Sequence, residues 1–279
     1  MTILLFSALL LCFSFLAGLL GSLTGLGGGI VIIPVLVLLF HINIHYAMGA
    51  SLISVIATSS GTTAAYIREG YTNLRIGMFL EVAAVIGAFF GALLIAFVSK
   101  TFLTVLFSLV LFFSAYLTIK RNEEHDHYKT SHPWATRLKL DGTYRLKNGE
   151  SVHYHVQNVP IAFFIMGVAG VLAGLLGIGS GAMKVLAMDQ ALCLPYKVAT
   201  TTSNFMIGIT AAVSAGIYFT HGYIIPSITF PVLIGVIAGA FFGAKLLTHI
   251  NNRVLRIIFS IVICFIGIQM LYNVLVGAA

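Results

Sequence analysis

The sequence is poor in charged residues. Only 8% of its 279 residues are Asp, Glu, Lys or Arg, whereas 59% are hydrophobic, and the mean hydropathy is +1.04. These values lie outside the range of soluble domains and inside that of proteins that cross a membrane several times. A nucleic-acid binder would gather Lys and Arg on an exposed face, and the apolar part of this chain offers none. The formal charge of +7 is therefore a signal of orientation in the membrane.

Cysteines and catalytic patterns are also scarce. Cys12, Cys193 and Cys264 stand alone in apolar runs, and no CxxC pair occurs. Isolated thiols in such runs behave as small buried hydrophobic groups. No HExxH motif is present, no histidine lies inside a predicted span, and no Ser or Cys has the partners of a hydrolytic site. We therefore expect no enzyme and no bound cofactor.

An internal repeat organises the chain. Gly25-Leu-Gly-Gly-Gly29 aligns with Gly177-Ile-Gly-Ser-Gly181, an offset of 152 residues, and GAFFGA recurs at the same offset, beginning at Gly87 and Gly239. A single ungapped offset of this kind indicates two copies of one structural unit. The sequence predicts a first transmembrane repeat at residues 1–119, a connector at 120–159 and a second repeat at 160–279.

Each repeat holds five apolar segments, most of which reach the roughly 20 residues that a helix needs to cross a bilayer. They are expected at 3–22, 27–40, 46–67, 74–98 and 102–119, and at 160–175, 178–194, 198–219, 224–247 and 254–276. The second segment of each repeat is short and follows a glycine stretch. Because an odd number of spans inverts the second repeat, we predict an all-α integral membrane protein of two five-helix inverted repeats, with about ten transmembrane segments.

Basic residues orient this arrangement. With the connector in the cytoplasm, five of them outside the connector fall on the cytoplasmic side: Arg68, Arg75, Lys197, Arg253 and Arg256. This agrees with the positive-inside rule and places both termini outside the cytoplasmic membrane. The alternative has four spans per repeat, with each glycine stretch forming a re-entrant hairpin, and needs a different sidedness.

The connector differs from the rest of the chain in composition. Alternating residues flank Asn148-Gly149, the preferred pair for a type I′ turn, so a β-hairpin is expected. Five histidines lie here: His125, His127, His132, His153 and His155. Metal binding is the sharper hypothesis, but the spacings match no zinc framework. A solvated cytoplasmic loop is therefore favoured.

The two glycine stretches place irregular backbone where lipid would otherwise lie. Such backbone survives at membrane depth only where protein buries it or where it lines a wet cavity. Transporters use broken helices of this kind to present free N–H groups to an anion near the midplane. Dinucleotide binding is excluded because Ile30 replaces the last glycine of GxGxxG and no βαβ unit is present. Close helix packing through small residues remains the structural alternative.

Polar side chains near these stretches are the candidate ligands. Ser51, Ser203 and Asn204 could donate to an oxyanion, although such residues also cap helices or join them. Lys184 lies three residues past Gly181 without an acidic residue one turn away, and a lysine at membrane depth indicates function unless it snorkels to an interface. The candidate substrate ligands are Gly27, Gly28, Gly29, Ser51, Gly179, Ser180, Gly181, Lys184, Ser203 and Asn204.

Two carboxylates in the predicted spans are candidates for proton coupling. Glu81 lies in the fourth segment, six residues from Arg75, and Asp189 lies in the seventh, five residues past Lys184. Either could titrate during a transport cycle. For both, a position near an interface is favoured.

The motifs GLGGGIVIIPVL, GIGSGAMKVLAMD and LPYKVATTTSNFM together resemble the TauE/SafE family of sulfite exporters, also known as the 4-toluene sulfonate uptake permease family. The resemblance covers both repeats but not the connector. It implies transport of sulfite, thiosulfate or organic sulfur-containing anions. Ser180 stands where the family usually has a glycine, and Leu186 where a proline often stands. We expect Ser180 to add a hydroxyl donor, and the seventh segment to be less broken than the second, which retains Pro34.

The residues and the resemblance together predict a secondary transporter that works by alternating access. Its partners would be the lipid bilayer and a small sulfur-containing anion, with sulfite the first choice and export the expected direction. Nucleic acid is not expected as a partner, and self-association into a homo-oligomer stays open. Two alternatives remain: an anion channel that shares the site, and a membrane sensor or scaffold that acts through the histidine-bearing connector.

Overall fold

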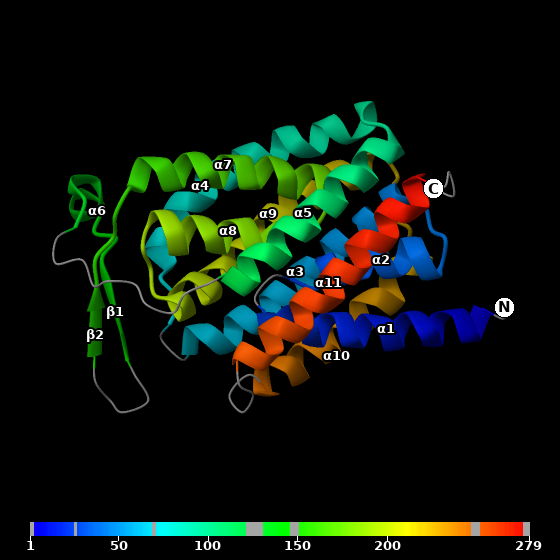
Figure 1. Cartoon of the computed structure of the whole chain (residues 1–279), viewed down its shortest axis with the longest axis horizontal. Coiled ribbons are helices and arrows are strands. Elements are labelled where there is room, and N and C mark those ends of the chain that lie inside the picture. Colours follow the sequence, from blue (N-terminus) through cyan, green and yellow to red (C-terminus); the bar gives the residue numbers. More distant parts are fainter. Residues whose placement is uncertain are drawn as a thin grey trace.

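The computed structural model describes residues 3–24, 27–68, 71–120, 131–145, 151–246 and 252–275. Within them, long helices form a bundle (Figure 1): α1 (Ile3–Thr24), α3 (Ile44–Arg68), α4 (Leu74–Leu93), α5 (Lys100–Lys120), α7 (Val159–Leu176), α9 (Tyr196–Thr220), α10 (Pro226–Leu246) and α11 (Asn252–Leu275). A 3₁₀ turn, η2 (Leu94–Phe97), extends α4. Among the described residues, five helical stretches are long and apolar enough to cross a membrane. The protein is therefore an all-α membrane protein, with helices close to the predicted segments.

The second segment of each repeat is a half-length helix. In the first repeat, α2 (Gly29–Pro34) continues into a π-helical turn, η1 (Val35–Leu39). In the second, α8 (Gly181–Leu186) continues into the π-helical turn η3 (Ala187–Ala191). Each run measures about 16 Å at 1.5 Å per residue, roughly half of a 30 Å hydrocarbon core. Both segments are short, as predicted.

The expected difference between these two segments is absent. Pro34 and Leu186 both end a six-residue helix, and a five-residue π-helical turn follows each of them. The expectation that Leu186 makes the seventh segment less broken was wrong. The break lies before the helix, where the glycines are, so the residue at its far end does not decide it.

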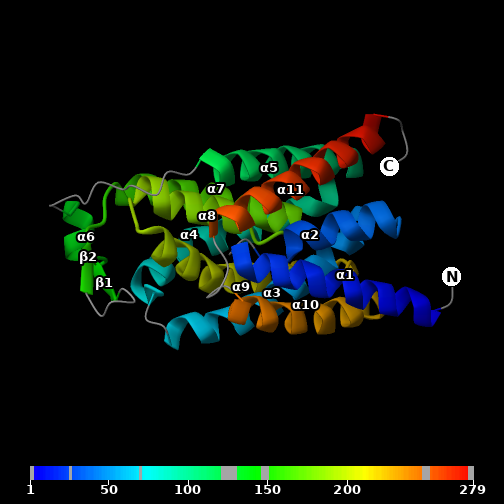
Figure 2. The same cartoon turned by 60° about the horizontal axis from the view of Figure 1, so that its bottom comes forward.

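Helices of the two repeats pack against one another in pairs. α1 packs along α10 and α4 along α7, while α3 packs against α9 and α5 against α11. Figure 2 shows α1 beside α10 and α5 beside α11. The 152-residue offset maps the α1–α10 pair onto the α4–α7 pair. Each repeat therefore packs its first helix against the fourth helix of the other repeat.

The repeated GAFFGA sequence explains how these pairs form. A Cβ atom on Gly87 would collide with the carbonyl of Gly167, and one on Gly239 with the carbonyl of Phe15, so the glycines allow backbones to touch. Phe90, 59% exposed, points away from the contact. The sequence thus joins a packing surface to an apolar outer surface, which suits a helix that faces lipid on one side.

The two ends of the bundle differ. Figure 1 shows the N- and C-terminal ends at one end of the bundle and the connector at the other. The connector contains α6 (Pro133–Arg137) and two antiparallel strands, β1 (Gly142–Arg145) and β2 (Ser151–Tyr154), with Arg145 opposite Ser151. The predicted turn at Asn148-Gly149 lies outside the described residues.

Candidate functional site

The two glycine stretches meet half-way along the long helices α3 and α9. A Cβ atom on either Gly27 or Gly179 would lie against Val55 and Ile207. Val55 and Ile207 are close to the midpoints of the 25-residue helices α3 and α9. These helices are about 37 Å long at 1.5 Å per residue, long enough to cross a bilayer. The glycine turns therefore lie near mid-depth in the bundle.

The backbone of these turns needs glycine. Gly27, Gly177 and Gly179 have φ angles of 80°, 65° and 66°, in the left-handed region. Glycine enters this region freely because it has no Cβ atom. The turns reverse the chain at mid-depth, after which α2 and α8 begin. Gly25 and Leu26 of the first motif lie outside the described residues.

Ser180 adopts a similar conformation without being glycine. Its φ is 40° and its ψ 42°, whereas its repeat counterpart Gly28 has a right-handed φ of −65°. The Ser180 hydroxyl donates to the carbonyl of Ala169 at 2.5 Å. The extra hydroxyl that the sequence offers therefore ties the turn to α7, and this bond supports a backbone conformation that costs a non-glycine residue about 1–2 kcal/mol.

Ser51 and Ser203 also bond to the glycine turns. The Ser51 hydroxyl donates to the Gly177 carbonyl at 2.8 Å, and the Ser203 hydroxyl donates to the Gly181 carbonyl at 3.3 Å. A hydroxyl has a single proton to donate. In this conformation both serines hold the turns in place, and each would have to rotate before it could donate to an oxyanion.

Asn204 brings an unused donor into the same region. Asn204 is 2% exposed, and its side-chain Nδ2 has no hydrogen-bond partner among the described residues. Its backbone carbonyl accepts from the Ser59 hydroxyl of α3. A buried amide nitrogen without a partner costs about 1–3 kcal/mol. Such a group is suited to donating to a ligand oxygen.

Lys184 and Glu81 form a buried ion pair. The Lys184 Nζ lies 3.1 Å from Glu81 Oε2, and the two side chains are 0% and 5% exposed. Nζ also donates to the Met206 carbonyl at 3.2 Å and to the Thr210 hydroxyl, which in turn donates to Glu81 Oε1. We name Lys184, Glu81 and Thr210 the charged cluster. It joins α8 and α9 of the second repeat to α4 of the first.

The charged cluster changes the sequence-based interpretation. In this conformation Lys184 does not snorkel to an interface, and its ammonium group is paired with the Glu81 carboxylate. Glu81, expected near an interface beside Arg75, is buried, and the Arg75 guanidinium instead donates to the Lys139 carbonyl of the connector at 3.4 Å. Asp189 is buried in η3 at 3% exposure.

Thr210 is a member of the cluster that the sequence reasoning missed. The sequence did contain a signal for the ion pair itself: Glu81 and Asp189 are the only carboxylates in the predicted spans, and a buried lysine needs one of them as its partner. The identity of the partner depends on how α8 packs on α4, across 103 residues of sequence. Sequence spacing does not supply that packing.

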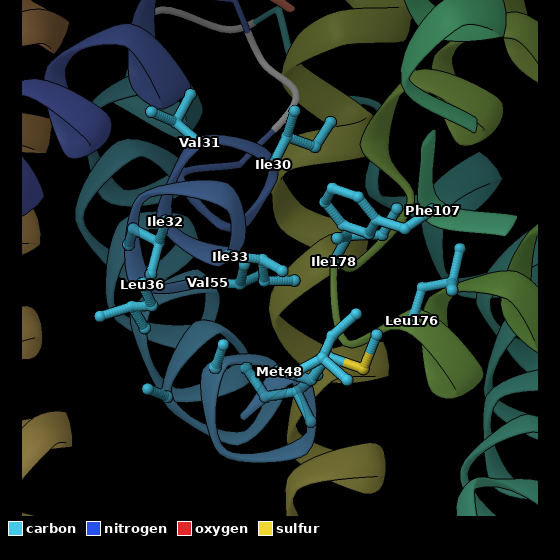
Figure 3. Close-up of a cluster of buried hydrophobic side chains, with 14 of the residues drawn as sticks. Ile30, Val31, Ile32, Ile33, Leu36, Met48, Val55, Phe107, Leu176 and Ile178 are labelled. Atoms are coloured by element: carbon cyan, nitrogen blue, oxygen red, sulfur yellow. The ribbon is translucent and has the colours of Figure 1, made fainter. Parts of the chain in front are cut away.

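Apolar side chains close the space between the glycine turns. Figure 3 shows Ile33 of α2 and Phe107 of α5 next to Ile178 of the second turn, with Val55 of α3 beside them. All four are fully buried. In this conformation buried apolar side chains therefore fill the space beside the second glycine turn.

The connector attaches to the bundle through Asn73. Its Oδ1 accepts from the Ile76 amide and caps α4, and its Nδ2 donates to the Leu140 carbonyl at 3.1 Å and to the Tyr154 hydroxyl at 2.8 Å. Its backbone amide donates to the Thr202 hydroxyl of α9 at 3.0 Å. Burial raises the pKa of Tyr154, so this hydroxyl stays protonated at neutral pH.

Two histidines of the connector, His132 and His155, make local hydrogen bonds, and His153 lies on β2 opposite Thr143. His132 Nδ1 accepts from the Trp134 amide at 3.2 Å and caps α6, and His155 Nδ1 lies 2.8 Å from the Ser131 hydroxyl. His125 and His127 lie outside the described residues. Within the described part of the chain, no group of three or more His, Cys, Asp or Glu side chains could hold a metal ion.

Comparisons with known proteins identify relatives of nearly the full chain. The family described as "Sulfite exporter TauE/SafE" matches residues 10–270. "Probable membrane transporter protein YdhB" of Bacillus subtilis strain 168 is 30% identical over 266 residues, covering 95% of this chain and 100% of the relative. YunE of the same organism, with the same description, is 30% identical over 282 residues, covering 95% and 97%.

A more distant relative comes from an archaeon. "Probable membrane transporter protein MJ0441" of Methanocaldococcus jannaschii is 26% identical over 278 residues, covering 94% of each chain. No solved structure matches the chain.

Proposed function

Because this chain belongs to the TauE/SafE sulfite exporter family of membrane proteins, we propose that it is a secondary transporter of a small sulfur-containing anion. Sulfite is the first substrate to test, with thiosulfate and organosulfonates next. The expected direction is export, with alternating access to a site near mid-depth. The names of the relatives, which describe probable membrane transporter proteins, support the transporter class. The substrate rests on the family description.

One observation carries the mechanism. Two half-length helices begin at glycine turns that lie side by side near the middle of α3 and α9. Irregular backbone at this depth is typical of secondary transporters, in which it lines the substrate site. The apolar contacts around Ile178 make this conformation a closed one. Separation of α2 from α8 would open the site toward one side at a time.

The proposed ligands lie around these turns. Backbone N–H groups of Gly27–Gly29 and Gly179–Gly181 would approach the anion, and Asn204 would donate from its unpartnered amide. Ser51 and Ser203 would join after their hydroxyls rotate away from the turn carbonyls. Lys184 would supply the positive charge, and Glu81 or Asp189 would carry a coupling proton.

The orientation in the membrane is also part of the proposal. The connector and the arginine and lysine side chains near it would face the cytoplasm, with both ends of the chain outside. Two contacts support the presence of basic residues at the end of the bundle where the connector lies. Arg75 donates to the connector backbone, and Lys197 lies over the Tyr71 ring, 5.5 Å from its centroid. Cysteine labelling from outside tests this directly. A Ser151→Cys variant should react only after permeabilisation.

Reconstituted transport tests the function. We expect proteoliposomes loaded with radiolabelled sulfite to show saturable efflux and counterflow with unlabelled sulfite, which a channel does not give. Lys184→Ala should abolish both, whereas Lys197→Ala, the same change outside the site, should retain them. Flux of thiosulfate or a sulfonate without sulfite flux would change the substrate. Absence of flux for every sulfur anion would reject the transporter and favour the sensor alternative.

A further inference from the structure

The charged cluster occupies one of two places that the internal repeat relates. The 152-residue offset pairs Lys184 with Ile32, Glu81 with Leu233 and Thr210 with Thr58. Ile32 is 2% exposed, and Thr58 donates to the Ser54 carbonyl at 2.7 Å, a contact within its own helix. One repeat-related site is therefore ionic and the other apolar. Because the repeat-related position packs without an ion pair, packing alone does not explain the pair between Lys184 and Glu81.

Every donor of Lys184 is occupied in the closed conformation. An ammonium group has three N–H donors, and Nζ has three acceptors within reach: Glu81 Oε2, the Met206 carbonyl and the Thr210 hydroxyl. An anion can bind to this ammonium only by displacing one of them. Glu81 is the natural one to leave, because it competes for the same charge.

Displacement of an ionised Glu81 would leave two buried negative charges against a single positive one. Removing one partner from a buried ion pair is strongly destabilising because the remaining charge is uncompensated. A proton on Glu81 removes this excess charge. Resting on the proposed function, we propose that the anion and Glu81 compete for Lys184, and that Glu81 takes up one proton for each anion bound.

This exchange defines a proton-coupled cycle. In the empty protein, Glu81 is ionised and paired with Lys184, which gives the neutral closed cluster of the structure. In the loaded protein, the anion contacts Lys184 and Glu81 carries a proton drawn from the side to which the site is open. On release, the proton leaves with the anion and the pair closes again. Anion and proton move in the same direction, and a monoanion is carried without net charge.

Other titratable groups around Glu81 are few. Helix α7, which packs along α4, has no titratable side chain, and α9 carries Tyr196, Lys197 and Tyr218. Lys197 lies over the Tyr71 ring, and the Tyr218 hydroxyl donates to the Leu175 carbonyl. On α8 and η3, Asp189 is the further carboxylate. In the described part of the chain, the Lys184 Nζ lies 3.1 Å from Glu81 Oε2, so we assign charge compensation at Lys184 to Glu81.

The charge moved per anion tests the proposal. Sulfite gradients are imposed across proteoliposomes of the full chain, and a potassium–valinomycin system sets the voltage at which net sulfite flux reverses. Glu81→Gln keeps the side-chain shape but cannot change charge. We expect each sulfite to move one more negative elementary charge in Glu81→Gln than in the wild type. The protonation of sulfite itself affects both proteins equally.

A second pair of variants serves if Glu81→Gln does not fold. Thr210→Val removes the hydroxyl that donates to Glu81, and Thr58→Val makes the same change at the repeat-related position. A hydrogen bond to a charged group is worth about 1.5 kcal/mol or more, which corresponds to about one pH unit. We expect the midpoint of the pH dependence of sulfite flux to rise by about that much in Thr210→Val and to stay unchanged in Thr58→Val.

Three results would overturn the proposal. The first is Glu81→Gln with the same charge per sulfite as the wild type. The second is a one-charge change in Asp189→Asn, which would assign the coupling to Asp189. The third is an identical pH profile for Thr210→Val and Thr58→Val. Each of these leaves sulfite transport intact, whereas failure of the proposed function removes wild-type flux itself.

Discussion

Replacement of the buried ion pair by the residues of the other repeat gives the sharpest test of the structure. Lys184→Ile and Glu81→Leu install, at one repeat-related position, the residues found at Ile32 and Leu233 in the other. Either change alone leaves a buried charge without its partner, at a cost of about 3–5 kcal/mol. Both changes together leave an apolar contact, and such replacements are neutral or stabilising by about 1–4 kcal/mol.

Thr210 is compatible with a stable double variant. Its hydroxyl lies 3.0 Å from the Met206 carbonyl of its own helix, so it keeps an acceptor after Glu81 is removed. The double variant therefore buries no unsatisfied hydroxyl. We expect the free energy of unfolding of the double variant to match or exceed that of the wild type, with a coupling energy of at least about 6 kcal/mol between the two sites.

Unfolding in mixed detergent–denaturant micelles measures these energies, and binding of the substrate anion is measured on the same samples. The double variant should be stable and unable to bind. Single variants whose free energy of unfolding lies within about 1 kcal/mol of the wild-type value would refute the reasoning, because removing one partner of a buried ion pair should cost more than that. A double variant as unstable as the single ones would show that the cluster also positions α8 against α4.

Three further changes have distinct expected outcomes. Asn204→Leu removes the unpartnered amide and inserts the residue found at its repeat counterpart, Leu52, so we expect about 1–2 kcal/mol of added stability and a KM for sulfite efflux raised at least tenfold. Ser180→Ala loses the bond to Ala169 at a cost of about 1 kcal/mol, whereas Ser180→Gly also relieves the left-handed backbone, so thermal unfolding should place the glycine variant above the alanine variant. Asn73→Ala removes the cap of α4, which costs about 1 kcal/mol, and detaches two connector bonds; faster proteolysis of the connector at unchanged sulfite flux is the expected result.

Much of the helical framework could be predicted from the sequence, because apolar length and the 152-residue repeat are local or translational signals. Helices α3 and α9 begin and end within two residues of the predicted segments. The short second segments follow from the glycines that precede them. The packing of Gly87 on Gly167 was not predictable in detail, because the small residues reveal a contact surface but not which helix covers it.

The candidate site could be predicted only by residue type. Glycines, hydroxyls and a lysine in the predicted spans indicate which residues the proposed anion site would use. Their bonding depends on how distant helices pack, so the Ser51 bond to the Gly177 carbonyl, across 126 residues, could not be read from spacing. The same is true of the pair between Lys184 and Glu81. Sequence reasoning treated these two residues as separate functional groups, although the structure pairs them at 3.1 Å.

The internal repeat explains why one half of the protein carries most of the chemistry. Repeated backbone geometry gives two turns near mid-depth, but Lys184 and Asn204 of the second repeat face a first repeat that has Ile32 and Leu52 at the equivalent positions. Glu81, from α4 of the first repeat, completes the cluster, and its own counterpart is Leu233. The first repeat thus supplies a scaffold, one carboxylate and the apolar surface beside the proposed anion site. Substitutions at Ile32 and Leu52 should therefore act through packing alone. Removal of the unpartnered Asn204 amide, or replacement of Lys184 together with Glu81, should instead weaken anion binding while stability is unchanged or increased.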